Sequence, residues 1–174
     1  MPSAGLTQTG AFTSTTRDLI NTSFSVNSDY KVLAATATYS ANVVAATIGG
    51  FSWSVVPGTY VFEMSLPTTL TTVGGLTVSF LLTTATLTSI QYQTYASTAA
   101  DATTAVSTSG TTATSGTKVF DSKTAAYTVV KVYGSMVVAT AGTFTWQACQ
   151  NTSAGSGDAS LILLGAYSKL IQVV

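Results

Sequence analysis

The chain has 174 residues, enough to bury the core of one domain, and only 7% of them are charged, with six basic residues against six acidic ones. This balance lacks the positive surface that nucleic-acid binding requires, and the absence of histidine removes the usual general base, the Ser-His-Asp triad and most zinc sites. Abundant threonine, valine and serine favour strand faces and turns over helices. We therefore expect an all-β protein that is not an enzyme and binds no cofactor, metal or nucleic acid.

So few charges are unusual for the surface of a lone soluble monomer, which is commonly about 25–35% charged. We expect much of this surface to be covered by copies of the chain, as a homotrimer. No stretch reaches the roughly 18 unbroken apolar residues of a membrane span, and the start, MPSAGLTQTG, has neither the basic nor the apolar region of a signal peptide. A membrane or classically secreted protein is therefore not expected.

Residues 1–30 are small and polar and show no sustained period, which predicts an extended N-terminal arm. Its scattered large apolar side chains are candidate partner-binding residues, because each could occupy a pocket on a neighbouring protein: Leu6, Phe12, Leu19, Ile20 and Phe24. Residues 31–174 are predicted to form one β-sandwich domain. Within it, residues 31–50 are expected to supply one or two strands that end at the break Gly49-Gly50.

Alternation of apolar and polar residues is clear from Phe51 onward and is typical of half-buried strands. Residues 51–55 and 60–66 alternate around the turn dipeptide Pro57-Gly58, which predicts a β-hairpin. Two further strands are expected, with buried faces formed by Leu76, Val78, Phe80 and Leu82 and by Ile90, Tyr92 and Thr94.

The Ala/Ser/Thr tract 96–117 has almost no large side chain, so we expect a long excursion that includes at most short strands. Regular alternation returns in residues 127–139 and again in 142–149, where Phe144, Trp146 and Ala148 share one face. The stretch SLILLGAYSKLIQVV is apolar on both faces and is predicted to be a central or interface strand.

About eight strands without a helical period predict an antiparallel β-sandwich, best described as a jelly roll. An immunoglobulin-like sandwich is the main rival, and the Cys…Trp…Cys pattern it would often show is absent.

Residues that could carry chemistry have simpler structural interpretations. Cys149 has no histidine to activate it and no basic residue near it in sequence, so we expect a small residue near a strand end. Glu63 is expected to be an exposed strand residue paired with a lysine. Trp53 and Trp146 could form a sugar-stacking platform, but each shares its face with apolar residues, which favours the core.

Two triplets, beginning at Asn21 and Asn151, match the glycosylation pattern, but the absence of a signal peptide makes the match weak. Asn151 is expected instead to shape a turn with its side chain.

Three stretches, TYVFEMSL, VGGLTVSFLL and VKVYGSMVVATAGTFTWQACQNTSAGSGDASLILLGAYSKL, resemble in this order a β-sandwich module of tailed-bacteriophage virion structural proteins. The residues that match its strands and turns are Tyr60, Phe62, Glu63, Gly74, Gly75, Gly134, Ser135, Gly142, Thr143, Gln147, Gln150, Asn151, Gly165, Tyr167 and Leu170. The resemblance implies a virion component, commonly trimeric, and no catalysis.

Two roles fit that resemblance: a capsid decoration (cement) protein, or a head or tail fibre module that binds a receptor such as a glycan. A fibre subunit usually needs a shaft of repeats or heptads, and the sequence has neither, which favours decoration. The expected partners are further copies of the chain and the major capsid protein or another virion protein. The expected location is the virion, assembled in the host cytoplasm.

Overall fold

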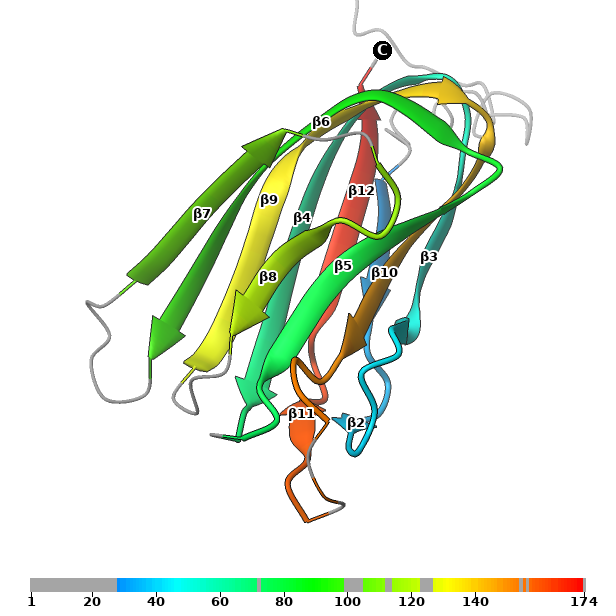
Figure 1. The fold of residues 1–174 in the computed structure, drawn as a ribbon. Coiled ribbons are helices and arrows are strands. Elements are labelled where there is room, and N and C mark those ends of the chain that lie inside the picture. The colour runs from blue at the N-terminus through cyan, green and yellow to red at the C-terminus, as the bar shows by residue number, and fades with distance from the viewer. Residues whose placement is uncertain are drawn as a thin grey trace, which may run out of the picture.

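The computed structural model describes residues 28–71, 73–98, 105–111, 114–122, 127–153, 155 and 157–173. All regular secondary structure in these ranges is β-strand, arranged in two sheets whose strand pairs are all antiparallel (Figure 1). The predicted all-β class and the antiparallel β-sandwich are therefore confirmed. The arm residues Leu6, Phe12, Leu19, Ile20 and Phe24 lie outside the described residues, as does Asn21.

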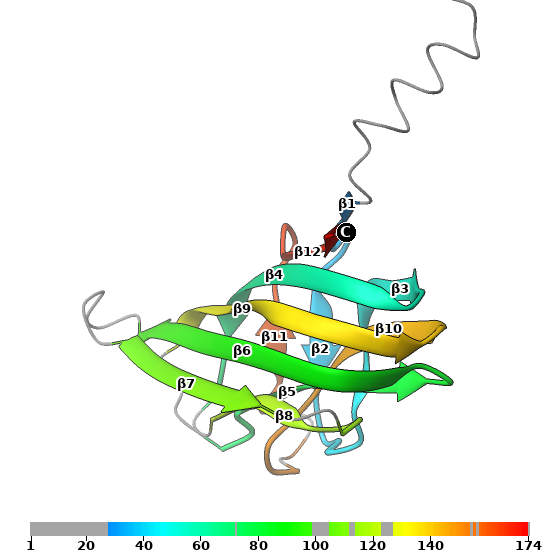
Figure 2. The same cartoon turned by 90° about the horizontal axis from the view of Figure 1, so that it is seen from above.

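The large sheet has eight strands. Six follow one another across it: β1 (Ser28–Val32), β12 (Tyr167–Val173), β4 (Gly58–Thr69), β9 (Tyr127–Thr140), β6 (Thr86–Thr98) and β7 (Ala105–Thr111). Beside β4 lies β11 (Ser160–Ile162), which in turn pairs with β2 (Ala37–Tyr39). Seen from above, β7, β6, β9 and β4 lie side by side in that order (Figure 2).

The small sheet has four strands in the order β3 (Ala46–Val55), β10 (Gly142–Cys149), β5 (Leu76–Thr83) and β8 (Lys118–Ser122). Across both sheets the pairing is nested: β1 pairs with β12, β2 with β11, β3 with β10, β4 with β9, β5 with β8 and β6 with β7. The chain is thus one long antiparallel ribbon wound over into two layers. This winding supports the jelly-roll assignment, which stays a prediction.

The core lies between the sheets and uses the faces that alternation predicted. The aromatic rings of β10 pack on each other and on a ring of the large sheet, with Trp146 5.1 Å from Phe144 and 5.6 Å from Phe62 between ring centroids. Phe62 belongs to the large sheet and Trp146 to the small one, so this contact joins the two layers. Trp53 is also buried, and the predicted core role of both tryptophans is confirmed.

The predicted hairpin of residues 51–66 is wrong. β3 pairs with β10, and β4 pairs with β12 and β9, so the link at Val56 and Pro57 crosses from one sheet to the other. The Tyr60 hydroxyl holds this corner: it accepts a hydrogen bond from the Val56 amide and donates one to the Val56 carbonyl, each at 3.0 Å. Alternation marks the buried face of a strand but not its partner.

The predicted break at Gly49-Gly50 is also wrong, because β3 runs through it as a bulge. Ser52 lies opposite Thr145 and Thr47 opposite Gln147, so the intervening residues of β3 face one residue of β10. Gly49 and Gly50 have φ of 31° and 86°, a backbone region that glycine adopts without a Cβ clash.

Three other boundaries differ from expectation. The stretch SLILLGAYSKLIQVV is divided into β11 and β12 by a turn at Gly165, whose φ is 89°, although β12 is an internal strand as predicted. The Ala/Ser/Thr tract contributes the end of β6 and all of β7, while residues 99–104 and 112–113 lie outside the described residues. Ser28 to Tyr30, assigned to the arm from sequence, belong to β1, so only residues 1–27 remain for the predicted arm.

Candidate interaction surfaces

Within the described ranges, no three side chains of the types that ligate metals are grouped where they could hold an ion. Among those same residues, no helix is long and apolar enough to cross a membrane.

Cys149 is the last residue of β10 and is buried. Burial raises the pKa of its thiol. The charge of Lys118 lowers this pKa, and the charge of Asp121 raises it further. Those two side chains form an ion pair 2.8 Å long on β8, close in space although far in sequence. A thiol whose pKa is raised stays protonated near neutral pH, so it is poorly suited to act as a nucleophile.

Glu63 is exposed on β4, on the side of the large sheet that faces away from the core. Lys169 of β12 lies opposite it in register, but the predicted pairing of their charges stays a prediction. The hydrogen bond to its carboxylate comes from Tyr167, whose hydroxyl donates to Glu63 Oε1 at 2.7 Å. This bond raises the pKa of Tyr167, since ionisation of the hydroxyl would remove the donor.

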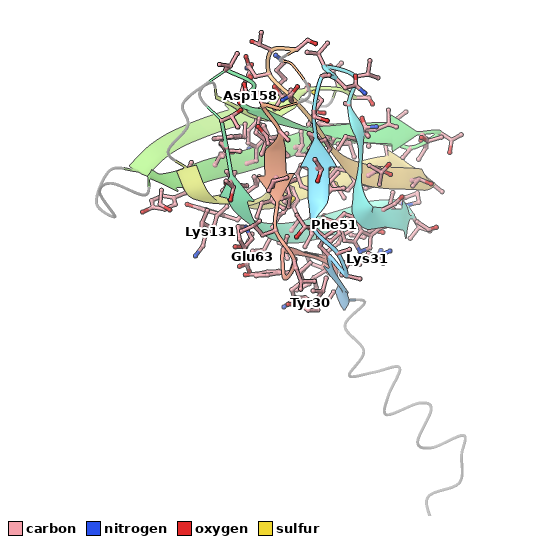
Figure 3. The ribbon with its side chains drawn as sticks, turned by 90° about the horizontal axis from the view of Figure 1, so that it is seen from below. Tyr30, Lys31, Phe51, Glu63, Lys131 and Asp158 are labelled. Carbon is pink, nitrogen blue, oxygen red and sulfur yellow. The ribbon has the colours of Figure 1, made fainter. Side chains whose placement is uncertain are left out.

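The side of the large sheet that faces away from the small one, here called the outer face, exposes large apolar side chains. Six of those in the described residues lie on it: Tyr30, Val32, Val61, Tyr133, Val137 and Val173. They come from β1, β4, β9 and β12, which are neighbours in the sheet. Figure 3 shows Tyr30, Glu63 and Lys131 along the same side of the molecule. The outer face thus exposes apolar side chains, with polar and charged ones such as Thr59, Glu63 and Lys169 between them in register.

A hollow of about 300 Å³ lies on the outer face. It is lined by Val61, Phe62, Glu63, Tyr133, Gly134, Lys169 and Ile171. Its walls are two cross-strand rows, with Lys169, Glu63 and Tyr133 in one and Ile171 and Val61 in the other.

The outer face carries tyrosine rings that are partly accessible, and the hydroxyls of Tyr133 and Tyr167 are hydrogen-bonded. The Tyr133 hydroxyl donates to Gln93 Oε1, and the Tyr30 ring lies 5.4 Å from the Tyr167 ring between centroids. Such rings combine a fixed orientation with apolar area, which suits them to interfaces.

The loops at the opposite end of the sandwich from the C-terminus form a second surface, here called the loop end (Figure 1). Gln150 ties it together: its side-chain amide donates to the Asp158 carbonyl at 2.6 Å, and its backbone amide donates to the Asn42 carbonyl at 3.0 Å. The Gly74 carbonyl accepts from Asn151 and Thr152. Three loops are thereby joined, and they expose the apolar side chains Val43, Val44 and Val73.

Residues that carried the resemblance have structural roles in this fold. Gly74 lies against Gln150, where a Cβ would overlap the Gln150 side-chain amide. Gly134 lies under Phe62, and a Cβ there would come within 2.8 Å of Phe62 Cζ. The Asn151 side chain accepts a hydrogen bond from the Thr152 hydroxyl at 3.2 Å, which fits its predicted turn role.

The outer face is the surface that sequence reasoning missed. Its signal was present, because Val61, Val137 and Val173 occupy outward positions that an ordinary solvent-facing strand would give to polar residues. The inward positions of these strands carry no sign of this surface.

No protein-family model matches the chain, and no curated protein matches it. Among solved structures, one similar chain belongs to "Structure of infectious bursal disease virus Gx strain", with 14% sequence identity and a TM-score of 0.19. The alignment covers 84% of this chain and 36% of that one, so the chain spans about a third of that protein's length. A likeness this weak bears on neither fold nor function.

Proposed function

We propose that the protein is a structural component of a phage virion, a capsid decoration (cement) protein that acts as a homotrimer. Its other partner is the major capsid protein or another virion protein, and it resides in the virion after assembly in the host cytoplasm. The observation that carries the proposal is the apolar outer face, on a chain with only 7% charged residues.

Contiguous exposed apolar surface is uncommon on isolated monomers and marks sites of protein association. The side chains that could have supported catalysis are better explained structurally, since Cys149 is a buried thiol with a raised pKa and Glu63 accepts a hydrogen bond from Tyr167. A rigid two-sheet scaffold with apolar exposed side chains suits binding rather than turnover. The resemblance to phage virion modules supplies the specific context.

The trimer is supported by the low charge and by the exposed valines of the loop end, Val43, Val44 and Val73, which the outer face does not include. Light scattering on the purified chain gives its mass directly. The expected mass is three times 17.8 kDa, about 53 kDa. A monomer at micromolar concentration would contradict this part of the proposal.

Attachment is assigned to the arm, because each of its scattered large apolar side chains could occupy a pocket on a neighbouring protein and many copies on a lattice would act together. The test compares the full chain with a chain that starts at Ser28, by co-sedimentation with particles that lack the protein. The full chain should bind saturably. The shortened chain should keep its trimeric mass and β-type circular dichroism but lose binding; equal occupancy by both would place attachment in the sandwich loops.

The alternative function is a head or tail fibre module that binds a receptor, and the hollow on the outer face is the observation in its favour. It combines the Tyr133 ring with the carboxylate of Glu63 and the amine of Lys169, groups that can stack on and hydrogen-bond a sugar. A glycan screen with the purified chain separates the two functions. Binding that Tyr133→Ala abolishes would favour the fibre module.

A further inference from the structure

We propose that the arm, residues 1–27, binds across the outer face of the large sheet of its own chain, with one of its large apolar side chains in the hollow beside Val61 and Ile171. This inference concerns the same face and the same arm as the proposed function, and it applies to the free protein, before a capsid captures the arm.

The apolar side chains exposed on the outer face would be stabilised by contact with another segment or protein. Tyr30 is 57% exposed and Tyr133 is 45% exposed, and Val61 and Ile171 lie side by side in register between β4 and β12. Burying such area is the main favourable term in protein association. A hollow of about 300 Å³ has room for one large apolar side chain, so the face can accept a protruding residue as well as a flat surface.

The chain brings the arm to this face. β1 is the edge strand of the large sheet, and its first residue, Ser28, lies opposite Ile171, which lines the hollow. An extended chain spans about 3.3 Å per residue, so 27 residues reach up to about 90 Å. The four strands from β1 to β9 lie roughly 4.8 Å apart, which places the whole apolar surface within about 15 Å of β1.

Charge also matches. The only charged side chains in residues 1–27 are Arg17 and Asp18, while the outer face carries Glu63 with Lys131 and Lys169. Both arm charges therefore find partners of opposite sign. A second copy fits less well, because two such faces in contact would bring together four of these lysines and two of these glutamates.

Tethering favours the arm of the same chain over one from a neighbour. A short flexible connection holds a segment at an effective concentration in the millimolar range near its own site. In the proposed decoration protein, a capsid that captured the arm would at the same time uncover the outer face.

Limited trypsin digestion tests the proposal, because Arg17 is the only lysine or arginine before Lys31. Val61→Gln removes an apolar side chain from the hollow. Leu81→Gln is the matched control, because Leu81 is 37% exposed and Val61 is 39% exposed, but Leu81 lies on the small sheet. Cleavage after Arg17 should become at least about five-fold faster in Val61→Gln and stay at the wild-type rate in Leu81→Gln. Equal rates in all three proteins would overturn the proposal.

A second measurement does not depend on how Val61→Gln folds. A photo-crosslinking residue, p-benzoylphenylalanine, replaces Val137 of the outer face, with the same replacement of Leu81 as control. The proposal predicts crosslinks from position 137 to peptides within residues 1–27, in a product of monomer mass. Crosslinks that join two copies, or a yield no higher than at position 81, would overturn it.

Discussion

Trp146 offers the sharpest test of the packing between the two sheets. Its side chain is 0% exposed, and its ring meets Phe144, Phe62 and Phe80 edge to face, at centroid distances of 5.1, 5.6 and 6.3 Å. Truncating a buried tryptophan to alanine costs about 3–5 kcal/mol in total, and three aromatic pairs of roughly 0.5–1.5 kcal/mol each, which are part of that total, favour its upper end. We therefore expect Trp146→Ala to lose about 5 kcal/mol of unfolding free energy.

Urea unfolding followed by circular dichroism, at fixed protein concentration, measures this loss. With a slope near 2 kcal/mol per molar urea, a loss of about 5 kcal/mol lowers the midpoint by about 2.5 M. Trp146→Phe should lose much less, since a ring remains and the indole N–H, buried with no acceptor among the described residues, is removed. The exposed control Leu81→Ala should stay within about 0.5 kcal/mol of wild type.

A shift below about 0.5 M for Trp146→Ala would refute the reasoning. It would mean that the ring does not join the layers, and that the nested pairing does not enclose a common core.

Three further predictions concern single residues. The Cys149 thiol should react slowly with a thiol reagent at pH 8 and rapidly in denaturant, because the thiol is buried and burial raises its pKa. Fast labelling of the folded protein would contradict this burial. Cys149→Ser should leave the oligomeric mass unchanged. Gly134→Ala should lower the free energy of unfolding in urea by more than about 2 kcal/mol, because the added Cβ would overlap the Gln91 carbonyl oxygen. Gly155→Ala should be neutral, because the space beside Gly155 is open, and equal effects of the two substitutions would contradict the close packing at Gly134. Burial and, secondarily, the charge of Cys149 raise the pKa of Tyr39 to about 12, so the stability that this hydroxyl contributes is full below pH 10 and is lost as the pH rises toward 12. Between pH 8 and pH 11 the urea midpoint of Tyr39→Phe should therefore fall less than the midpoint of wild type. Equal falls in the two proteins would contradict the assignment.

Much of the strand content could be predicted because alternation is a local property. In residues 51–55, 60–66 and 142–149, every second side chain is apolar and is buried as expected. The error at Pro57 arose because the same local pattern serves a hairpin and a crossing between sheets. Pairing partners depend on residues about 90 positions away, as for Trp53 and Phe144, and no local signal specifies them.

Glycines explain the other errors. Gly49 and Gly50 suggested an end of strand, but in this fold they form a bulge inside β3. The alternating pattern does not by itself reveal the candidate surface, because valine is common in strands whether or not they bind a partner. Val61 and Val137 differ from an inward valine only in their place in the alternation, so the outer face becomes visible when both faces of each strand are tracked.

The central claim is a structural role in the virion, and the most direct test is to find the protein on the particle. The proposal implies that a phage encodes the chain, and cryo-electron microscopy of the virions of that phage, with an antibody label on the sandwich, would give the position and copy number of the protein. The proposed role predicts density for the two-sheet domain at equivalent sites over the whole capsid lattice. Density confined to the tail, or particles without the protein, would contradict it.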